Sequence, residues 1–380
     1  FSLRAGAGNL TIEEIEEGVA YAHERGVKCH MTFNIFAHNE DIEPLRAYLD
    51  SIKHIPVDAY IVSDPGVITL IKEIIPHAEL HLSTQANMTN YVTANFWHQQ
   101  GVKRLVLARE LTFGEIKDIK ARIPETMELE SFVHGAMCIS YSGRCLLSNF
   151  MIDRDANRGQ CAHPCRWKYH LVEEKRPGEY YPVEQDNTGT YIMNSRDMCL
   201  IEHIPELVKA GINSFKIEGR AKSAYYTAVS VNAYRCALDS YEKSGFAEEW
   251  NPEQWIIEEV RKASNRQYCT GFYFSTPMDD AQIFYNGGYV REWDVAAIAE
   301  DWKDGVLYAS QRNRFFEGDE LEVMIKGKEP IKITVKNLRN SEGETVENAP
   351  HPMMKFSIDC PVEIPAGSYL RMERKSGVIL

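Results

Sequence analysis

Several features are missing from this sequence of 380 residues. No run of about 18 uncharged apolar residues is present, so no segment is suited to cross a bilayer as a helix. The first residues, FSLRAGAGNLTIEEIEEG, have no basic start and no apolar core, which argues against a secretory signal peptide. They also lack an initiator Met and resemble the middle of a domain, so we expect further residues upstream. The missing export signal favours a reducing, cytoplasmic location.

Positive charge is also scarce, because the formal net charge is −13. This balance gives no sign of the broad basic surface that nonspecific binding to polyanions requires. One stretch, 138–170, is the exception, with five basic and two acidic side chains and hence a net charge of 5 − 2 = +3. The basic residues are Arg144, Arg154, Arg158, Arg166 and Lys168.

Familiar protease motifs are absent as well. No H-E-x-x-H zinc motif occurs, and the string SYSGR around Ser142 lacks the first glycine of a G-x-S-x-G nucleophile elbow. A cysteine protease built from Cys138 and His134 is conceivable. A single reactive thiol would not explain three further cysteines nearby, so peptidase activity is the weaker alternative.

The basic stretch coincides with a cluster of cysteines. Four of the nine cysteines fall within 28 residues with the spacing C-x6-C-x15-C-x3-C, at Cys138, Cys145, Cys161 and Cys165. The possible uses are disulfides, a metal site, a reactive thiol or buried small side chains. The reducing compartment and the odd total number of cysteines argue against disulfides. The density of cysteines in this segment argues against a single reactive thiol and against buried small side chains.

Two metal sites remain for the four thiols, zinc or an iron–sulfur cluster. Only Cys161 and Cys165 have the short spacing that is usual at zinc sites, and the longer gaps favour a 4Fe–4S cluster. Nearby arginines would lower the thiol pKa values and favour the ligand form. Cys199 is a fifth candidate ligand. The scattered Cys29, Cys236, Cys269 and Cys360 are predicted to be buried small side chains.

The first half of the chain alternates apolar, β-branched runs with amphipathic stretches. Strands are expected at 27–36, 58–64, 79–85, 104–110 and 129–135, with one more in the string PELVKAGINSFKIEGR. Helices are expected at 41–52, 65–75, 89–101 and 112–123 and in SAYYTAVSVNAYRCALDSYEKSG. Strands that are apolar on both faces and followed by helices indicate parallel β/α units.

Six such strands predict an α/β fold, a TIM-like (β/α)8 barrel that lacks its two N-terminal strands in this chain. A doubly wound sheet is the alternative. The predicted domains are a barrel over 1–249 with a cysteine-rich insertion at 138–190, a connector at 250–283, and a small antiparallel β-barrel at 284–380. A hairpin is expected within the string GEYYPVEQDNTGTYIMNSRD.

Polar residues stand at the carboxyl ends of the predicted strands, the face that carries active sites in such barrels. They are Asn34, Asp64, Ser83, Gln85, Arg109, Glu110, His134, Glu218 and Arg220. We predict catalytic roles for Arg109, Glu110 and His134, the last two in proton transfer, and a substrate-binding role for Gln85. A structural hydrogen-bonded pair of Glu110 with His134, and a salt bridge of Glu218 with Arg220, are the alternatives.

Several strings resemble a known family, peptidase family U-32, the collagenase-like proteins. They are ESFVHGAMCISYSGRCLLSNF, RDANRGQCAHPCRW, NSRDMC, FKIEGRAKSAYY, ELHLSTQANMTN and LARELT, and the resemblance extends over essentially the whole chain. It implies a 4Fe–4S cluster on the four clustered cysteines. It further implies hydroxylation chemistry that is linked to prephenate and independent of molecular oxygen.

Within the family, the sequence motifs are most similar to those of the branch that makes 5-hydroxyuridine at the tRNA wobble position. Other branches hydroxylate ribosomal RNA cytidine or a ubiquinone precursor, and a noncatalytic RNA-binding protein is a further alternative. Arg144, Arg154, Arg158 and Arg166 would then bind RNA phosphates or the carboxylates of prephenate. Tyr141, with Phe150, Trp167 and Tyr169, would stack on an extruded base.

Overall fold

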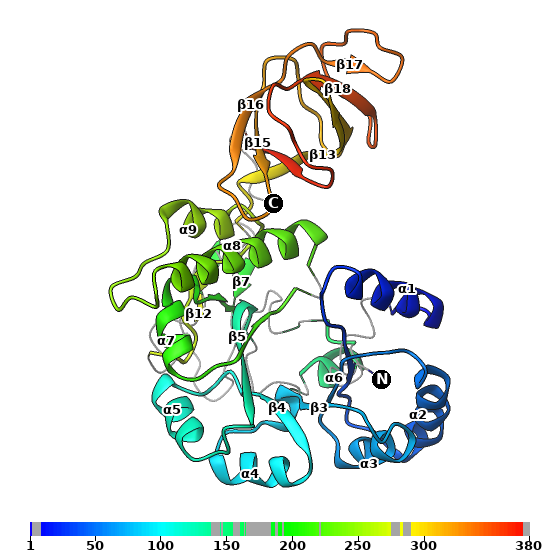
Figure 1. The fold of residues 1–380 in the computed structure, drawn as a ribbon, viewed down its shortest axis with the longest axis vertical. Helices are drawn as coiled ribbons and strands as arrows, with labels where there is room; N and C mark the ends of the chain where they lie inside the picture. Colours follow the sequence, from blue (N-terminus) through cyan, green and yellow to red (C-terminus); the bar gives the residue numbers. More distant parts are fainter. Residues whose placement is uncertain are drawn as a thin grey trace, which may run out of the picture. The chain divides into compact units, whose positions relative to one another are not determined.

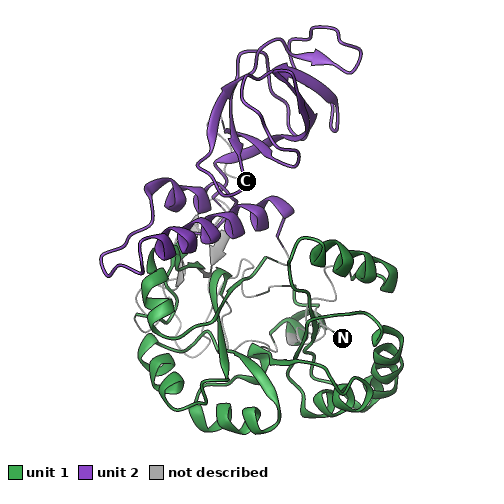
Figure 2. Cartoon of the chain, in the orientation of Figure 1, with its two compact units in different colours: residues 1–221, 268–287 green, residues 222–267, 288–380 purple. Residues whose placement is uncertain are grey.

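The computed structural model describes most of the chain in two compact units (Figure 2). Unit 1 comprises 1–221 and 268–287, and unit 2 comprises 222–267 and 288–380. The residues that the structure describes are 1, 9–137, 145, 147–154, 160–162, 164, 184–186, 189–191, 194–219, 222–274, 282–283 and 290–374. None of the described helices is long and apolar enough to cross a membrane.

Unit 1 contains the parallel strands that the sequence predicts. In sheet order they are β1 (His30–Phe33), β2 (Ala59–Val62), β3 (Leu80–Leu82), β4 (Val102–Val106) and β5 (Glu128–Ala136), and β10 (Ser214–Ile217) also pairs with β5. Each of these neighbouring pairs is parallel. The mixed α/β class with a parallel sheet is therefore confirmed, whereas closure into an eight-stranded barrel stays a prediction.

Helices follow the strands and lie around them (Figure 1). They are α2 (Asn39–Ile52), α3 (Pro65–Ile74), α4 (Tyr91–Gln99), α5 (Phe113–Ala121) and α7 (Ile204–Lys209). Local sequence explains where α3 begins, because the Asp64 carboxylate accepts from the Val67 N–H at 3.0 Å and Pro65 occupies the first turn. Asp64, one of the polar strand-end residues, thus caps a helix.

The first helix, α1 (Ile12–His23), is absent from the sequence prediction. Thr11 and Glu14 form a capping box, in which each side chain accepts from the backbone N–H of the other residue. The motif T-x-x-E ahead of an amphipathic stretch is the signal that could have revealed this helix.

Two short strands make the sheet of unit 1 mixed. β9 (Asp197–Cys199) runs antiparallel to the end of β5, and β11 (Tyr268–Cys269) runs parallel to β9. The stretch predicted as a connector thus contributes β11 to this sheet, and it also contains α9 (Gln254–Arg261). The expected hairpin is confirmed as the antiparallel pair β6 (Glu184–Asp186) and β7 (Gly189–Tyr191). A second antiparallel pair joins β8 (Asn194–Ser195) to β12 (Gln282–Ile283).

Unit 2 combines a helical pair with an antiparallel sheet. The helices are α8 (Ala224–Lys243) and α9, and the sheet has the order β16-β15-β19-β13-β14-β18-β17. Its strands are β13 (Trp293–Lys303), β14 (Val306–Gln311), β15 (Glu320–Met324), β16 (Ile331–Thr334), β17 (Arg339–Asn340), β18 (Lys355–Asp359) and β19 (Tyr369–Glu373). The predicted antiparallel module is confirmed as a sheet, and the predicted domain bounds stay a prediction.

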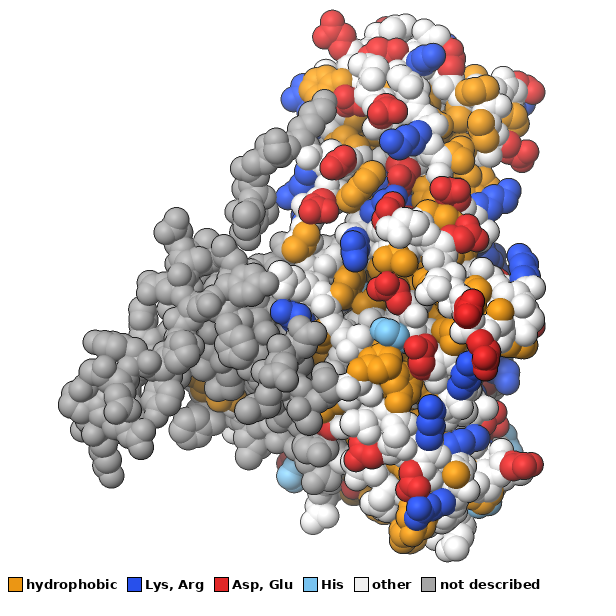
Figure 3. Space-filling view, turned by 90° about the vertical axis from the view of Figure 1, so that its left-hand side faces the viewer, with side chains coloured by type: hydrophobic (Ala, Val, Ile, Leu, Met, Phe, Trp, Pro, Cys, Tyr) orange, Lys and Arg blue, Asp and Glu red, His pale blue; other side chains and the backbone are white. Residues whose placement is uncertain are grey.

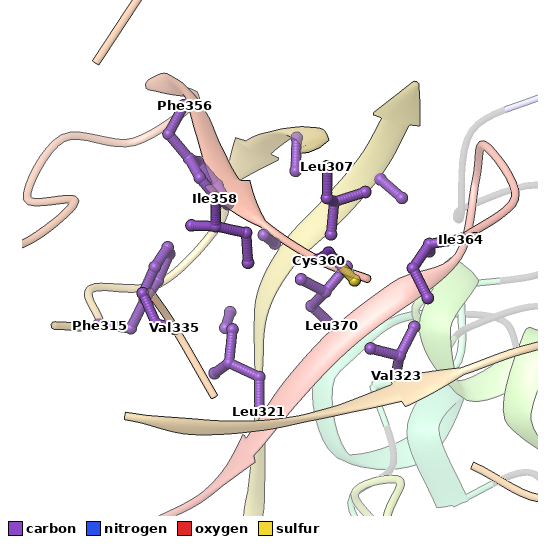
Figure 4. Packing of buried hydrophobic residues seen from close by; sticks show 14 of the residues in the cluster. Leu307, Phe315, Leu321, Val323, Val335, Phe356, Ile358, Cys360, Ile364 and Leu370 are labelled. Atoms are coloured by element: carbon purple, nitrogen blue, oxygen red, sulfur yellow. The ribbon is translucent and has the colours of Figure 1, made fainter. Parts of the chain in front are cut away.

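A compact apolar core fills the sheet of unit 2 (Figure 4). Leu307, Phe315, Leu321, Ile358 and Leu370 are buried in it, and the Phe315 and Phe356 rings meet edge to face at 5.0 Å. Burial of several large side chains supplies most of the stabilisation of such a small module, at about 1.5–3 kcal/mol for each side chain.

Buried charges join the helical pair to this sheet. Arg371 on β19 is 0% exposed, and its guanidinium donates to Glu259 of α9 at 2.8 and 2.5 Å and to Glu322 of β15 at 2.8 Å. Lys262 donates to Glu322 at 2.7 Å. Burial alone would raise the pKa of Glu322, but Arg371 and Lys262 outweigh it and hold that pKa below its usual value. The network therefore contains two cations and two carboxylates in close contact.

Candidate functional site

Polar side chains at the carboxyl ends of the parallel strands meet across the sheet. The Asn34 amide, after β1, donates to the Ser83 hydroxyl, after β3, at 3.0 Å. Arg109, after β4, lies 3.8 Å from the Glu218 carboxylate, after β10. In each contact the two residues follow strands that are separated by one other strand, β2 in the first contact and β5 in the second. These side chains therefore lie on one face of the sheet. The structure thus brings Asn34 together with Ser83, and Arg109 together with Glu218, at the carboxyl ends of the strands.

Arg109 is held in a defined position. Its guanidinium carbon lies 3.7 Å from the centre of the Phe132 ring on β5, and the side chain is buried. Stacking on an aromatic ring and pairing with Glu218 fix the plane of the guanidinium. Such a preoriented cation is suited to bind an anionic or carbonyl group of a substrate.

A second layer of charge lies further down the strands. Glu130 on β5 accepts from Lys216 of β10 at 2.7 Å, from Ser214 at 2.9 Å and from Arg104 of β4 at 3.3 Å. Burial alone would raise the pKa of Glu130, but Lys216, Ser214 and Arg104 outweigh it and lower that pKa. This layer was not predicted from the sequence, although Glu130, Phe132 and His134 alternate along β5 with the period of a strand face.

Three polar atoms at neighbouring strand ends are buried and have no hydrogen-bond partner among the described residues. They are the Ser63 hydroxyl after β2, the Gln85 amide nitrogen after β3 and one Glu110 carboxylate oxygen after β4. Burial raises the pKa of the Glu110 carboxyl. Unpaired buried polar groups are costly, so three of them at adjacent strand ends make this edge of the sheet a candidate binding site. Ser63 was missed by the sequence analysis.

His134 lies at the end of β5, fully buried. It stands opposite Cys199 in the antiparallel pairing of β5 with β9, and its ring centre is 5.3 Å from that of Tyr268. The backbone N–H of Glu218 donates to the His134 carbonyl at 2.9 Å. The structure thus places His134 beside the fifth candidate cysteine, and its predicted role in proton transfer stays a prediction.

Gly135 permits the close approach of β5 and the chain after β10. Its φ is +115°, and a Cβ atom there would lie 2.7 Å from the Glu218 carbonyl oxygen. Gly135→Ala is expected to lower the free energy of unfolding by more than the roughly 1–3 kcal/mol of backbone strain, because the clash adds to that strain. Thermal or chemical unfolding of the purified variant measures this loss.

Gly245→Ala is the matched control for that variant. Gly245 also has a positive φ, +70°, but no atom lies within 4 Å of the added Cβ. In this control, backbone strain alone should lower the free energy of unfolding. Equal losses in the two variants would contradict the proposed contact between Gly135 and Glu218.

Tyr273, which comes from much later in the chain, forms hydrogen bonds to β5. Tyr273 donates to the Phe132 carbonyl at 2.9 Å and shares a hydrogen bond with the Ser131 hydroxyl. Burial raises the pKa of Tyr273 to about 12. Tyr273 therefore remains a neutral hydrogen-bonding group at physiological pH and supports the strand that carries His134.

Two of the four clustered cysteines lie in the part of the chain that the structure describes. Cys145 precedes the short helix α6 (Leu147–Ile152), and Cys161 precedes Ala162, whose N–H donates to the Ser148 hydroxyl at 3.2 Å. This bond ties the segment of Cys161 to the helix that follows Cys145. Neither cysteine forms a disulfide with a described residue, and both are partly exposed. The predicted cluster on the four cysteines stays a prediction.

Of the remaining residues predicted in this segment, the structure describes Arg154. Arg154 is exposed just after α6, where its backbone N–H donates to the Ser148 carbonyl at 3.3 Å. Among the described residues there is no group of three metal-binding side chains. The other predicted ligands and substrate-binding residues lie outside the described residues: Cys138, Cys165, Tyr141, Arg144, Arg158 and Arg166.

The scattered cysteines follow the prediction with one exception. Cys236, Cys269 and Cys360 are buried. Cys29 is only partly buried, so its predicted burial is wrong. The reason is its position just before β1, where its backbone N–H donates to the Asp58 carboxylate at 2.7 Å near the surface.

Surface charge gives no further site on the face seen in Figure 3. Acidic and basic side chains are interspersed over its described part. A pocket of about 350 Å³ lies between the starts of α4 and α5, lined by Thr89, Asn90, Tyr91, Gly114, Glu115, Asp118 and Ile119. Its two carboxylates make it unsuited to anions.

Three features of the chain define its class. They are a parallel α/β sheet with polar strand ends, a cysteine-rich segment, and an antiparallel module that follows them. The family model of peptidase family U32 matches 1–283, and the model of the family's C-terminal domain matches 291–371. The chain therefore belongs to peptidase family U32.

Curated relatives extend over nearly the whole chain. The tRNA hydroxylation protein P1 of Bacillus subtilis (strain 168) is 38% identical over 367 residues, which are 94% of this chain and 85% of that protein. The tRNA hydroxylation protein P of Escherichia coli (strain K12) is 34% identical, with 99% and 91% covered. The 23S rRNA 5-hydroxycytidine C2501 synthase of the same organism is 31% identical, with 86% and 48% covered.

Proposed function

We propose that this protein is an RNA hydroxylation enzyme that makes 5-hydroxyuridine at the wobble position of tRNA. The observation that carries the proposal is the match to two tRNA hydroxylation proteins over 94% and 99% of the chain. The relative named for ribosomal RNA covers this chain less fully and supports the wider class of RNA hydroxylation. Polar residues gathered at the strand ends provide a site for such chemistry.

The proposed cofactor is a 4Fe–4S cluster held by Cys138, Cys145, Cys161 and Cys165. The bond between Ala162 and Ser148, which ties the segments of Cys145 and Cys161 together, supports it. When bound, such a cluster supplies electron-transfer chemistry that side chains cannot. The proposal includes prephenate or a related small carboxylate as a partner and a reaction independent of molecular oxygen.

The side chains at the strand ends have distinct proposed roles. Arg109, fixed by Phe132 and Glu218, binds a carboxylate or carbonyl group of a reactant. Glu110 and His134 accept or return a proton. The raised pKa of Glu110 suits this task, because a carboxyl whose pKa moves toward neutrality exchanges protons more readily at physiological pH. Arg144, Arg154, Arg158 and Arg166 bind RNA phosphates or the small carboxylate.

The family name offers peptidase activity as the alternative. The sequence argues against it, because neither an H-E-x-x-H zinc motif nor a G-x-S-x-G nucleophile elbow is present. Gelatin cleavage that disappears in Cys138→Ala would revive this alternative.

Analysis of tRNA nucleosides tests the proposed function directly. In a strain that lacks the gene, 5-hydroxyuridine in bulk tRNA is expected to be reduced at least tenfold, and a plasmid carrying the gene should restore it. Mass spectrometry of digested tRNA measures the change. Unchanged tRNA nucleosides in that strain would contradict the proposal and direct the search to ribosomal RNA or a quinone precursor.

A further inference from the structure

The unpaired polar atoms at the ends of β3 and β4 have opposite hydrogen-bonding character. The Gln85 amide nitrogen is a donor, and the Glu110 carboxylate oxygen is an acceptor. Neither atom has a partner among the described residues, and Gln85 is only 2% exposed. A buried donor and a buried acceptor left unpaired in the free chain define what a ligand must offer, namely an acceptor beside a donor.

Backbone and side-chain bonds hold these two residues near each other. Gln85 lies in a single 3₁₀ turn, η2 (Thr84–Ala86), and the Thr84 hydroxyl donates to the Leu107 carbonyl at 3.1 Å. The Ala108 N–H donates to the Met88 carbonyl at 3.5 Å. The turn that carries Gln85 is thus fastened on both sides to the segment that leads into Glu110, and neighbouring strands are separated by only about 4.8 Å.

From this arrangement we propose that Gln85 and Glu110 are specificity residues that read the imide edge of a uracil base. The inference rests on the proposed function, which supplies the pyrimidine substrate. Uracil presents its O4 acceptor next to its N3–H donor, which matches the Gln85 N–H and the Glu110 oxygen. Cytosine presents an amino donor next to an N3 acceptor, so both contacts would be mismatched.

Burial of the two atoms suits an extruded base. A base that remains stacked in an RNA loop cannot reach an atom that is shielded from solvent, whereas a flipped base inserts its Watson–Crick edge fully. Insertion would satisfy both unpaired atoms at once, and a mismatched base would leave them unpaired. Rejection of a ligand that leaves buried polar groups without partners is strong, often larger than 100-fold.

The test uses the full-length holoprotein and two anticodon stem-loop RNAs that differ only in uridine or cytidine at the wobble position. Wild-type protein should bind the uridine RNA at least tenfold more tightly. Gln85→Met removes the donor and should reduce this preference at least tenfold, and Glu110→Met, which removes the acceptor, should reduce it similarly. The Kd values are measured by fluorescence anisotropy at one fixed salt concentration.

A stability measurement separates recognition from a structural role. Because the Gln85 amide nitrogen has no partner, Gln85→Met should leave the Tm unchanged or raise it. Gln311→Met is the matched control, since Gln311 is equally buried but donates to the Ala349 carbonyl at 3.1 Å. This control should lower the Tm and keep the preference for uridine.

Two outcomes would overturn the inference. One is an unchanged preference for uridine in Gln85→Met, and the other is a loss of Tm in Gln85→Met as large as in Gln311→Met. Either result is compatible with loss of 5-hydroxyuridine in the deletion strain, so the proposed function can stand when this inference fails. Conversely, unchanged tRNA nucleosides in that strain would contradict the proposed function without any binding measurement.

Discussion

Cys161→Ala is expected to remove most of the iron from the purified protein and to reduce tRNA hydroxylation more than 100-fold. This variant would remove one of the four thiolates that are proposed to hold the cluster, and loss of even a supporting contact at a metal site costs about 10–100-fold. Cys161 is one of the two predicted ligands that the structure describes, and it is partly exposed. Iron and sulfide content, absorbance of anaerobically handled protein and 5-hydroxyuridine in complemented cells measure the effect.

Cys360→Ala is the matched control for this experiment. Cys360 is buried in the core of unit 2 and its thiol donates to the Val362 carbonyl at 3.2 Å (Figure 4). Its loss should cost about 1–2 kcal/mol of stability through the cavity that it leaves, with iron content unchanged. Full iron content and activity in Cys161→Ala would contradict the proposed ligand set.

Arg371→Met is expected to lower the free energy of unfolding of unit 2 by about 3–5 kcal/mol. Arg371 is fully buried and bonds Glu259 and Glu322, so its removal leaves two buried carboxylates with Lys262 as their remaining cation. An uncompensated buried charge costs far more than a missing surface contact. Chemical denaturation followed by circular dichroism measures the loss.

Arg235→Met supplies the control, because Arg235 pairs with Asp239 on the exposed face of α8. An exposed ion pair four residues apart on a helix contributes only about 0.3–0.5 kcal/mol. Adding Glu259→Gln to Arg371→Met should recover part of the lost stability, since one of the two unpaired charges is then removed. A loss no larger than that of Arg235→Met would show that water replaces the guanidinium without cost.

The parallel strands were predictable because most of them are rich in apolar, β-branched residues and alternate with amphipathic helices. The polar strand ends followed from the same reasoning, since parallel strands place their carboxyl ends at one edge. β9 and β11 were not predictable, because two or three residues carry no measurable periodicity. The position of β9 depends on pairing with β5, which lies far away in the sequence, and the position of β11 depends on pairing with β9.

At the cysteine cluster, the spacing of four thiols predicts a metal site, which stays a prediction. The contact between Ala162 and Ser148 was not predictable, because a serine hydroxyl gives no sequence signal for its distant partner. Unpaired atoms such as the Gln85 nitrogen are equally invisible in a sequence. Such atoms can be identified only when the three-dimensional positions of all neighbouring donors and acceptors are known.

The return of the chain from unit 2 to unit 1 has a consequence for synthesis on the ribosome. Tyr273 follows Ser131 by 142 residues, and α8 and α9 are made between them. β5 can therefore receive its last buried hydrogen bonds only after the whole helical pair has left the ribosome. Closing so long a loop is slow, and we expect the nascent sheet to depend on chaperones until Tyr273 has emerged.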